Sequence, residues 1–356
     1  MSGPYQLTVI DRVEVHLISM LREDGAYIVF SLNDNMISVC VSPHKSLITQ
    51  AFPFLRTKND RLQDHFVKTF IEGVQSRNRE EYEQARTNCL NVILAAGRHH
   101  FPQWTSSPDK SADCEKRLSD LLFPQVIYFR LEAAKGRATI VPISPDDVMS
   151  RVVIDPVLDR GLVTPVFNLG LPWFTPEQII VKQILYTGAA YAIAEVQVVN
   201  RKESLLCKAS GSPGGGIPGP SLRREAACLG KILRAFSIPK DIRLPRLFGY
   251  VSHKDTKEII GFLRQWVPGR KLSEIDITSV EEETRQKWIS QIRETFDQLH
   301  KKGIVWGDPR PGSVVIDENG DAWLTEFARG WWKDMEMKET KEGDEHSLAE
   351  VIELLK

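Results

Sequence analysis

The sequence lacks the cysteine pattern of a disulfide-stabilised or zinc-binding protein. Its five cysteines are odd in number and widely scattered, and no two of them form a CxxC pair or stand at Cys/His ligand spacing. We therefore expect them to be reduced and mostly buried. His99 and His100 are adjacent, so they do not share a helix face, and no acidic or cysteine cluster adjoins them. No metal held by cysteine or histidine is predicted.

Long apolar runs and net charge are also missing. No run approaches the ~20 apolar residues of a membrane span, and the first residues show no basic segment followed by an uninterrupted apolar core. We expect a cytoplasmic or nuclear protein without signal peptide, transmembrane segment or membrane partner. The formal net charge of −1 provides no electrostatic basis for binding nucleic acid, so no nucleic-acid partner is expected.

What is present is an ordinary globular composition, 42% hydrophobic and 26% charged, over a length that predicts about two domains. In the first part, residues 26–32 and 36–41 alternate like strands, and residues 60–96 follow a helical period that suggests two helices. We predict an α+β accessory region over residues 1–150. A proline-containing linker, residues 151–174, is expected to follow it.

The second part begins with a predicted antiparallel sheet. Strand patterns occupy residues 179–185, 192–199, 204–209, 244–251 and 258–266, and a helical pattern occupies 221–236. The run Gly211 to Pro220 is interpreted as a flexible linker because it contains three prolines. A capping box from Ser279 to Glu282 predicts the start of a long helix whose apolar stripe is Trp288, Ile292, Phe296 and Leu299.

The most informative stretch is residues 300–330. After the helix, a tight loop carries Asp308, and two short apolar runs, SVVID and AWLT, flank Asn319-Gly320. Asn-Gly suits the positive φ angles of a type I′ turn, which predicts a hairpin. Glu326 follows the returning strand, so the hairpin brings a second acid back toward Asp308.

This stretch resembles the catalytic loop and metal-binding segment of protein kinases, H-R-D-x-K-x-x-N followed by D-F-G. Asp308 corresponds to the catalytic Asp, Arg310 to the loop Lys, Ser313 to the metal-binding Asn, and Glu326-Phe327-Ala328 to D-F-G. The interval of 18 residues from Asp308 to Glu326 also agrees. The segments GIVWGD and AWLTEFA are similar in particular to kinase-like proteins of filamentous fungi.

The resemblance implies ATP and Mg²⁺ as cofactors. Lys208, in SLLCKA, is then the phosphate-binding Lys, Glu225 its ion-pair partner, and the backbone at Gln265 and Val267 the hinge that binds adenine. Of the three loop glycines only Gly188 remains, since Tyr186 and Tyr191 occupy the other positions. Ser313 and Glu326 are expected to hold Mg²⁺. Arg264, just before the hinge, is expected to crowd adenine or to desolvate poorly against it.

The fold implied is a bilobal protein kinase-like domain over residues 175–356. It comprises a small β-rich lobe, about 175–268, and a truncated α-rich lobe, about 269–356. The stretch between Glu326 and Asp344 is too short for a full activation loop, and the later helices of the large lobe are absent. Asp344 corresponds to the Asp that props up the kinase catalytic loop.

Three functions follow from the resemblance. The first is ATP-dependent phosphoryl transfer to a Ser or Thr hydroxyl of a protein, with Asp308 orienting the hydroxyl and Arg310 supplying positive charge. The second is a pseudokinase, a binding or scaffold module, because Arg310, Ser313, Glu326 and Ala328 depart from the kinase pattern. The third is a small-molecule phosphotransferase, because Trp306-Gly307-Asp308 resembles the H-G-D loop of aminoglycoside kinases. The identity of the substrate or partner protein is left open.

Overall fold

The fold comes from a computed structural model of the chain. It describes residues 13–21, 25–32, 35–41, 72, 78–97, 100–101, 115–134, 137–144, 169–188, 191–211, 218–236, 242–307, 309–327 and 340–356. The chain divides into two compact units: unit 1 contains residues 1–114 and 123–153, and unit 2 contains residues 115–122 and 154–356. Both units mix helices and strands, which confirms the α+β class. The limits 1–150, 151–174 and 175–356 stay a prediction.

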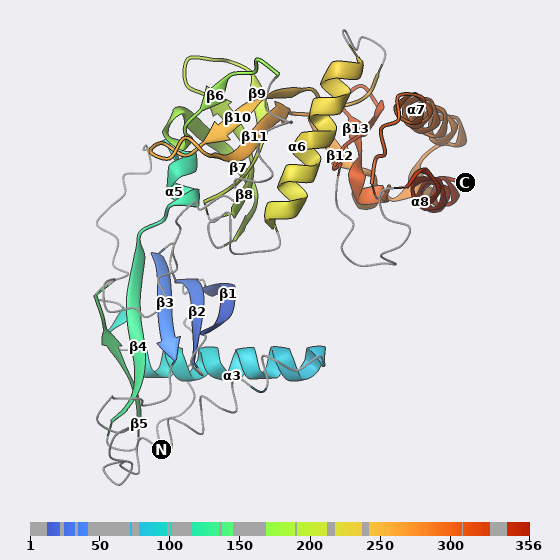
Figure 1. The fold of residues 1–356 in the computed structure, drawn as a ribbon. Coiled ribbons are helices and arrows are strands. Elements are labelled where there is room, and N and C mark those ends of the chain that lie inside the picture. Colours follow the sequence, from blue (N-terminus) through green and yellow to red (C-terminus); the bar gives the residue numbers. More distant parts are fainter. Residues whose placement is uncertain are drawn as a thin grey trace. The chain divides into compact units, whose positions relative to one another are not determined.

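The described part of unit 1 is a five-stranded sheet with a helix packed on it (Figure 1). The strand order is β1-β2-β3-β4-β5, and all neighbours are antiparallel except β3 and β4. The predicted strands 26–32 and 36–41 are confirmed as β2 and β3, whereas the first predicted helix lies mostly outside the described residues. The elements are β1 (Val13–Leu21), β2 (Gly25–Leu32), β3 (Asn35–Val41), α3 (Arg79–Gly97), β4 (Val126–Ala134) and β5 (Arg137–Pro142).

Unit 2 begins with a six-stranded sheet in the order β6-β10-β11-β9-β8-β7. Its neighbours are antiparallel except for β6 and β10. The five strands predicted between residues 179 and 266 are all present. The elements are β6 (Trp173–Phe174), β7 (Ile179–Gly188), β8 (Tyr191–Val198), β9 (Ser204–Ser210), β10 (Leu247–Ser252) and β11 (Ile259–Gln265).

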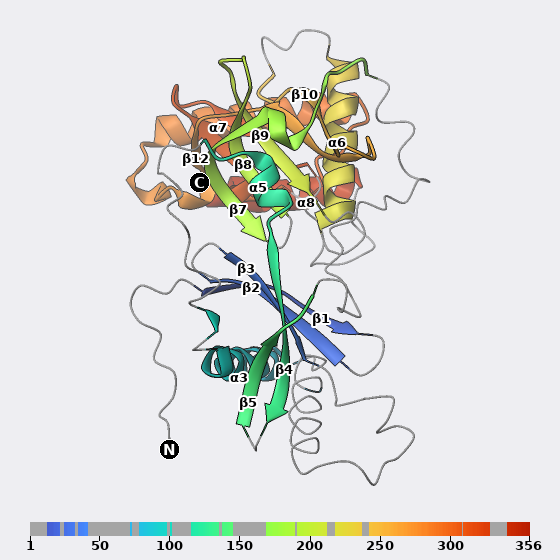
Figure 2. The same cartoon turned by 90° about the vertical axis from the view of Figure 1, so that its left-hand side faces the viewer.

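Residues 115–122 pack against the edge of this sheet (Figure 2). Arg117 forms an antiparallel bridge with Ile180, and the amide of Val181 donates to the carbonyl of Lys116 at 2.8 Å. The short helix α5 (Leu118–Leu122) then buries its leucines against β7 and β8. A segment that precedes β4 in the sequence therefore contributes to the stability of unit 2.

The rest of unit 2 is a set of helices and a second small sheet, ordered β12-β13-β14. Helix α6 begins at Pro218, so the predicted linker is wrong at its C-terminal end, because proline is compatible with the first turn of a helix. The elements are α6 (Pro218–Ala235), β12 (Gly269–Lys271), α7 (Glu282–Lys301), β13 (Val314–Asp317), β14 (Ala322–Leu324) and α8 (Lys341–Leu354).

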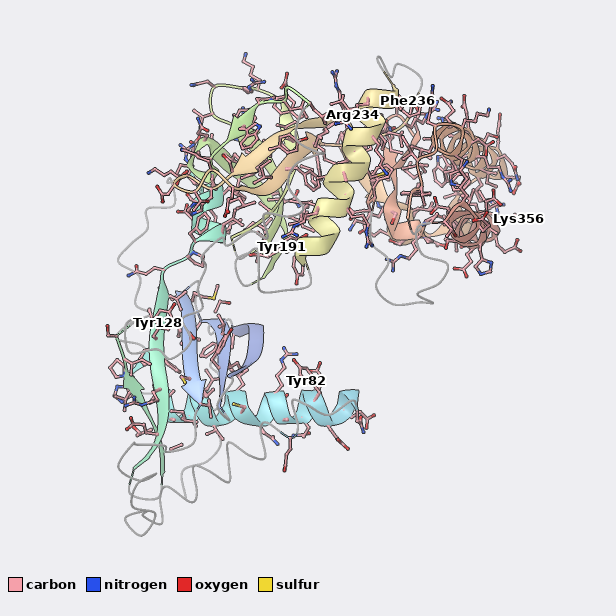
Figure 3. The ribbon with its side chains drawn as sticks, in the orientation of Figure 1. Tyr82, Tyr128, Tyr191, Arg234, Phe236 and Lys356 are labelled. Atoms are coloured by element: carbon pink, nitrogen blue, oxygen red, sulfur yellow. The ribbon has the colours of Figure 1, made fainter. Side chains whose placement is uncertain are left out.

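One buried core joins α6, β10, β11, α7, β13, β14 and α8. The predicted stripe Trp288, Ile292, Phe296 and Leu299 lies in it. Tyr191 packs against the same core, and Figure 3 shows it toward the opposite end of α6 from Arg234 and Phe236. These contacts hold α6, β10, β11 and the residues after β14 in one packed unit.

The predicted capping box at the start of α7 is wrong. The helix is preceded by Glu281, and this residue makes no side-chain cap. Ser279 instead ends a 3₁₀ turn, where its hydroxyl donates to the carbonyl of Asp276. Serine hydroxyls bond to nearby backbone in turns as readily as at helix caps, which explains the difference.

Among the helices that the structure describes, none has both the length and the apolar character needed to cross a membrane.

Candidate functional site

Two basic residues lie on one face of the six-stranded sheet. Lys208 on β9 pairs with Phe262 on β11, and Leu206 on β9 pairs with Arg264 on β11. Because cross-strand partners share a face and side chains alternate along a strand, Lys208 and Arg264 point to the same side and stand diagonally. Helix α6 packs on β9, and it presents Glu225 to these residues.

Four side chains then form what we call the ion cluster: Lys208, Glu225, Arg264 and Glu326. The amino group of Lys208 lies 2.7 Å from Oε2 of Glu225 and 2.7 Å from Oε2 of Glu326. The guanidinium of Arg264 approaches the other oxygens, with Nε 3.8 Å from Oε1 of Glu225 and Nη2 3.6 Å from Oε1 of Glu326. Two positive and two negative charges are thus gathered in one place.

The ion cluster is largely shielded from water. Lys208, Glu225 and Arg264 are each 5% exposed or less. Burial raises the pKa of Glu225, and the nearby Lys208 opposes that rise. Burying the Lys208–Glu225 pair removes water from both ions. The pair is stable only where its mutual attraction and its hydrogen bonds offset this loss of solvation.

The ion cluster is not fully satisfied. Within the part of the chain that the structure describes, Oε1 of Glu225 and Nε of Arg264 are buried atoms with no hydrogen-bond partner. They face each other at 3.8 Å, beyond hydrogen-bond distance. An unsatisfied buried polar group costs about 1–3 kcal/mol. Because these two atoms lack hydrogen bonds, a charged ligand at the site could provide them with partners.

The position of Glu326 is set by the residues around it. The amide and hydroxyl of Thr325 both donate to the carbonyl of Ser313, at 2.8 and 3.0 Å, and the indole of Trp306 donates to the carbonyl of Thr325 at 2.8 Å. Glu326 itself has a φ of 58°, a left-handed conformation that few residues other than glycine adopt. The backbone is therefore held in a strained turn that directs the carboxylate to Lys208.

The loop that precedes Asp308 is anchored by α8. The buried carboxylate of Asp344 accepts from the amides of Trp306 and Gly307 at 2.6 and 2.7 Å. It also lies 3.0 Å from Nε2 of His300, near the end of α7, and accepts a hydrogen bond from that nitrogen. This is the support for the loop that the kinase resemblance implied for Asp344.

The remaining predicted residues are placed as follows. Asp308 lies outside the described residues. Arg310 is exposed, Ser313 is the buried last residue of the 3₁₀ turn Pro311–Ser313, and Gly188 ends β7 opposite Tyr191. The rings of Tyr186 and Tyr191 lie 5.8 Å apart where kinases carry glycines. The structure thus brings Lys208, Glu225 and Glu326 together, and the binding roles of all the predicted residues stay predictions.

The predicted hinge follows β11 directly. The amide of Gln265 donates to the carbonyl of Arg246 at 2.8 Å, and its own carbonyl accepts from Nη1 of Arg264 at 3.2 Å. Gln265 has an exposed side chain, whereas Val267 is buried. One guanidinium therefore spans from the hinge carbonyl to the carboxylates of the ion cluster.

Sequence reasoning missed the role of Arg264 in the ion cluster. Its desolvation was expected to conflict with a ligand, but in the structure two carboxylates face it. A signal was present in the sequence. Arg264 stands in an apolar strand pattern, two residues after Phe262. The sequence already predicted that Lys208 pairs with Glu225 and that a second acid, Glu326, lies at the same site. An extra acid in a buried site requires an extra cation.

The geometry does not fit the magnesium ion that the resemblance implies at Ser313 and Glu326. Mg²⁺ requires near-octahedral oxygen ligands at about 2.0–2.1 Å. Both carboxylate oxygens of Glu326 already face protein cations, and Ser313 is buried. Over the described ranges, no group of three or more His, Cys, Asp or Glu side chains could hold a metal.

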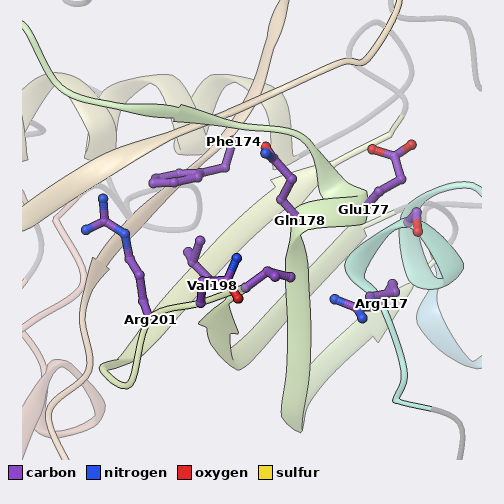
Figure 4. A pocket seen from close by; sticks show the side chains of 9 residues that line it. Arg117, Phe174, Glu177, Gln178, Val198 and Arg201 are labelled. Atoms are coloured by element: carbon purple, nitrogen blue, oxygen red, sulfur yellow. The ribbon is translucent and has the colours of Figure 1, made fainter.

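A pocket of about 590 Å³ lies elsewhere in unit 2, beside α5, β6 and the turn after β8 (Figure 4). Its two arginines are already engaged. Arg117 pairs with Glu115 at 3.2 Å, and the guanidinium of Arg201 lies over the rings of Phe174 and Phe248, at 5.6 and 5.0 Å from their centroids. The ion cluster is therefore the stronger candidate for a functional site than this pocket.

No family model matches the chain. The curated proteins that it matches include several serine/threonine-protein kinases. CBL-interacting serine/threonine-protein kinase 5 of Arabidopsis thaliana is 29% identical over 98 residues, 27% of this chain and 22% of that protein. Serine/threonine-protein kinase Warts of Drosophila melanogaster is 29% identical over 108 residues, 29% of this chain and 10% of that protein. Serine/threonine-protein kinase OXI1 of Arabidopsis thaliana is 30% identical over 87 residues, 23% of this chain and 20% of that protein.

The matches thus span between a tenth and a quarter of the length of these relatives. Over about a quarter of its own length, the chain has a kinase-like relationship to Ser/Thr protein kinases.

Proposed function

We propose that residues 175–356 form a bilobal protein kinase-like domain that binds ATP at the ion cluster. The observation that carries the proposal is the position of the Lys208 amino group, 2.7 Å from both Glu225 and Glu326. In kinases the same three positions supply the phosphate-binding Lys, its partner and the D-F-G acid. The partial relationship to Ser/Thr kinases supports the proposal independently.

In this proposal, the α- and β-phosphates and the adenine ring each have a binding group. Lys208 binds the α- and β-phosphates and is oriented by Glu225, the pair that α6 and β9 hold together. The backbone of Val267 binds the adenine ring. It is suited to do so, because within the described residues its amide and carbonyl make no backbone hydrogen bond. ATP binding draws Lys208 away from Glu326 while keeping its contact with Glu225.

The first candidate activity is phosphoryl transfer to a Ser or Thr hydroxyl of a protein. Asp308 would orient the hydroxyl and Arg310 would stabilise charge on the transferred group. The support for it is the anchoring of the loop by Asp344, which holds the backbone of Trp306 and Gly307 next to Asp308. The names of the related proteins give the acceptor class.

The second candidate is a binding module, a pseudokinase that uses the fold to hold a partner. The observation that favours it is the ion cluster itself, where Arg264 and Lys208 engage the carboxylate of Glu326. The arrangement supports nucleotide binding more directly than it supports transfer. A small-molecule phosphotransferase and a kinship with kinase-like proteins of filamentous fungi are further predictions from the sequence.

A thermal-shift titration with ATP tests the proposal. A ligand at 100 times its Kd stabilises the folded state by about 2.7 kcal/mol, so saturating ATP should raise the melting temperature of unit 2. Lys208→Met should abolish the shift, whereas Lys254→Met, on an exposed turn, should retain it. The tryptophans report on unit 2, because seven of the eight lie beyond residue 154.

The absence of an ATP-induced shift in the natural chain would contradict the proposal. A shift that persists in Lys208→Met would locate the nucleotide elsewhere. Incorporation of labelled phosphate into a protein acceptor, measured on the same preparation, then separates transfer from binding alone.

A further inference from the structure

The ion cluster contains one cation more than the kinase resemblance predicts. Lys208 contacts both carboxylates, and Arg264 adds a second positive charge 3.6 Å from Glu326 and 3.8 Å from Glu225. Arg264 is only 4% exposed, and a guanidinium keeps its proton in proteins. The four side chains, two positive and two negative, are therefore neutral as a group without any added ion.

This extra cation faces the carboxylate that would otherwise need a metal. In kinases a divalent cation lies between the D-F-G carboxylate and the phosphates, and it relieves their mutual repulsion. Here one oxygen of Glu326 contacts Lys208 at 2.7 Å and the other faces Arg264. The guanidinium already supplies the charge that makes this carboxylate compatible with a neighbouring anion.

Arg264 is also held in this position from the opposite side. Its Nη1 donates to the carbonyl of Gln265 at 3.2 Å, while Nη2 faces Glu326. A planar guanidinium has its donors in a fixed fork, so a contact at one end orients the other. Arg264 is therefore a fixed charge between hinge and carboxylate rather than a mobile surface side chain.

We propose that Arg264 takes the place of the divalent cation at Glu326, so that the site binds a nucleoside triphosphate without magnesium. The inference rests on the proposed nucleotide site and specifies its ligand as metal-free ATP. Arg264 acts as a specificity-determining residue, because it decides whether the nucleotide enters with or without its cation.

Isothermal titration calorimetry with ATP, in Mg²⁺ buffer and in EDTA buffer, tests the inference on the natural chain. The two affinities should agree within about twofold. Arg264→Met removes the charge but keeps an unbranched side chain, and it takes away the cation that faces Oε1 of Glu326. We expect Mg²⁺ to strengthen ATP binding by this variant about tenfold or more.

A double variant and a matched control complete the experiment. Arg264→Met with Glu326→Gln restores a neutral cluster, so its ATP affinity should again be indifferent to Mg²⁺. Arg246→Met makes the same substitution at an exposed position on the chain segment beside the hinge, and it should behave like the natural chain. Because the natural chain alone decides the main question, misfolding of a variant does not leave it open.

The outcomes separate the inference from the proposed function. Affinity of the natural chain that falls about tenfold or more in EDTA, together with loss of binding in Lys208→Met, would overturn the inference while the nucleotide site stands. No ATP binding in either buffer would overturn the nucleotide site and the inference together. Equal affinity in both buffers, with Mg²⁺ dependence appearing in Arg264→Met, is the expected result.

Discussion

Lys208 and Glu326 are 118 positions apart in the sequence, and their side chains meet at 2.7 Å. One residue lies on β9 and the other follows β14, so the contact joins the six-stranded sheet to the hairpin that follows α7. Glu225 completes it from α6 at the same distance. Three elements of unit 2 therefore converge on one amino group, which makes Lys208 a structural residue as well as a candidate ligand-binding one.

The first prediction concerns the stability that this convergence provides. Lys208→Met should lower the free energy of unfolding of unit 2 by about 3–5 kcal/mol, because it removes the cation that contacts both buried carboxylates at 2.7 Å. Adding Glu225→Gln should restore part of the loss, since it removes one of the uncompensated charges. Urea unfolding followed by tryptophan fluorescence measures both, with Lys254→Met as the control.

An additive loss in the double variant would contradict this interpretation. Residues that share a buried ion pair should show a clear interaction energy in a double-mutant cycle, whereas independent residues add within about 0.3–0.5 kcal/mol. The cycle thus decides whether the ion cluster behaves as a unit.

The sequence predicted those parts of the site that depend on local pattern. Strand alternation around Lys208 and the helical stripe of α7 were sufficient to place the sheet and the long helix. The Asn319-Gly320 pair was sufficient to place the hairpin that leads to Glu326, but the predicted type I′ turn is wrong, because only Gly320 has a positive φ. Each of these features is encoded by residues close to one another in the chain, through the periods of strands and helices and the φ angles of turns.

Features that depend on distant partners were not predictable in this way. Ser279 is a separate case, because both the turn at Asp276 and a cap of α7 are local options for its hydroxyl and the sequence pattern does not distinguish them. Arg264 was expected to be a poorly solvated charge, because its neighbours in sequence include no acid. The carboxylates that face it are Glu225 on α6 and Glu326 after β14, and only tertiary packing brings them to Arg264.

The second prediction concerns Asp344. Asp344→Ala removes the acceptor of two backbone amides and of His300, and it should lower the stability of unit 2 by about 2–4 kcal/mol. Glu345→Ala, the exposed neighbour on α8, should have little effect. Hydrogen exchange should be faster at Trp306 and Gly307 in the first variant only. Unchanged exchange at these two amides would show that the loop does not depend on Asp344.

The third prediction concerns Asp308, which lies outside the described residues. Asp308→Asn should abolish any phosphoryl transfer and leave the fold intact, because the role that the resemblance assigns to this Asp is to orient a hydroxyl rather than to pack. Circular dichroism and an ATP-turnover assay on the same preparation test both halves. Turnover that survives the substitution would remove Asp308 from the mechanism.

The fourth prediction is a pH dependence. Hydrogen bonds from Lys287 and Gln291 hold the pKa of Asp321 below its ordinary value. An acid whose folded pKa is depressed adds stability above its unfolded pKa, about 3.9, and that stability is lost as pH falls through the folded pKa. The difference in unfolding free energy between the natural chain and Asp321→Asn should therefore shrink on acidification below about pH 4.

The matched control for this pH dependence is Glu318→Gln, an exposed acid on the same hairpin. Its free energy of unfolding should stay close to that of the natural chain, because the side chain of Glu318 is exposed. If Asp321→Asn costs no more stability than Glu318→Gln at neutral pH, the hydrogen bonds to Asp321 do not stabilise the hairpin.

The last prediction concerns Leu118, which precedes β4 in the sequence but belongs to unit 2. Leu118 is fully buried where α5 packs on β7 and β8, so Leu118→Ala should leave a cavity and cost about 2–5 kcal/mol of unit 2 stability. Leu354→Ala makes the same change at a residue that is 45% exposed, and it should cost far less. Tryptophan-detected unfolding in urea compares the two. Equal, small losses of unfolding free energy in the two variants would mean that residues 115–122 contact the sheet without stabilising it, and that the edge of β7 is stable without them.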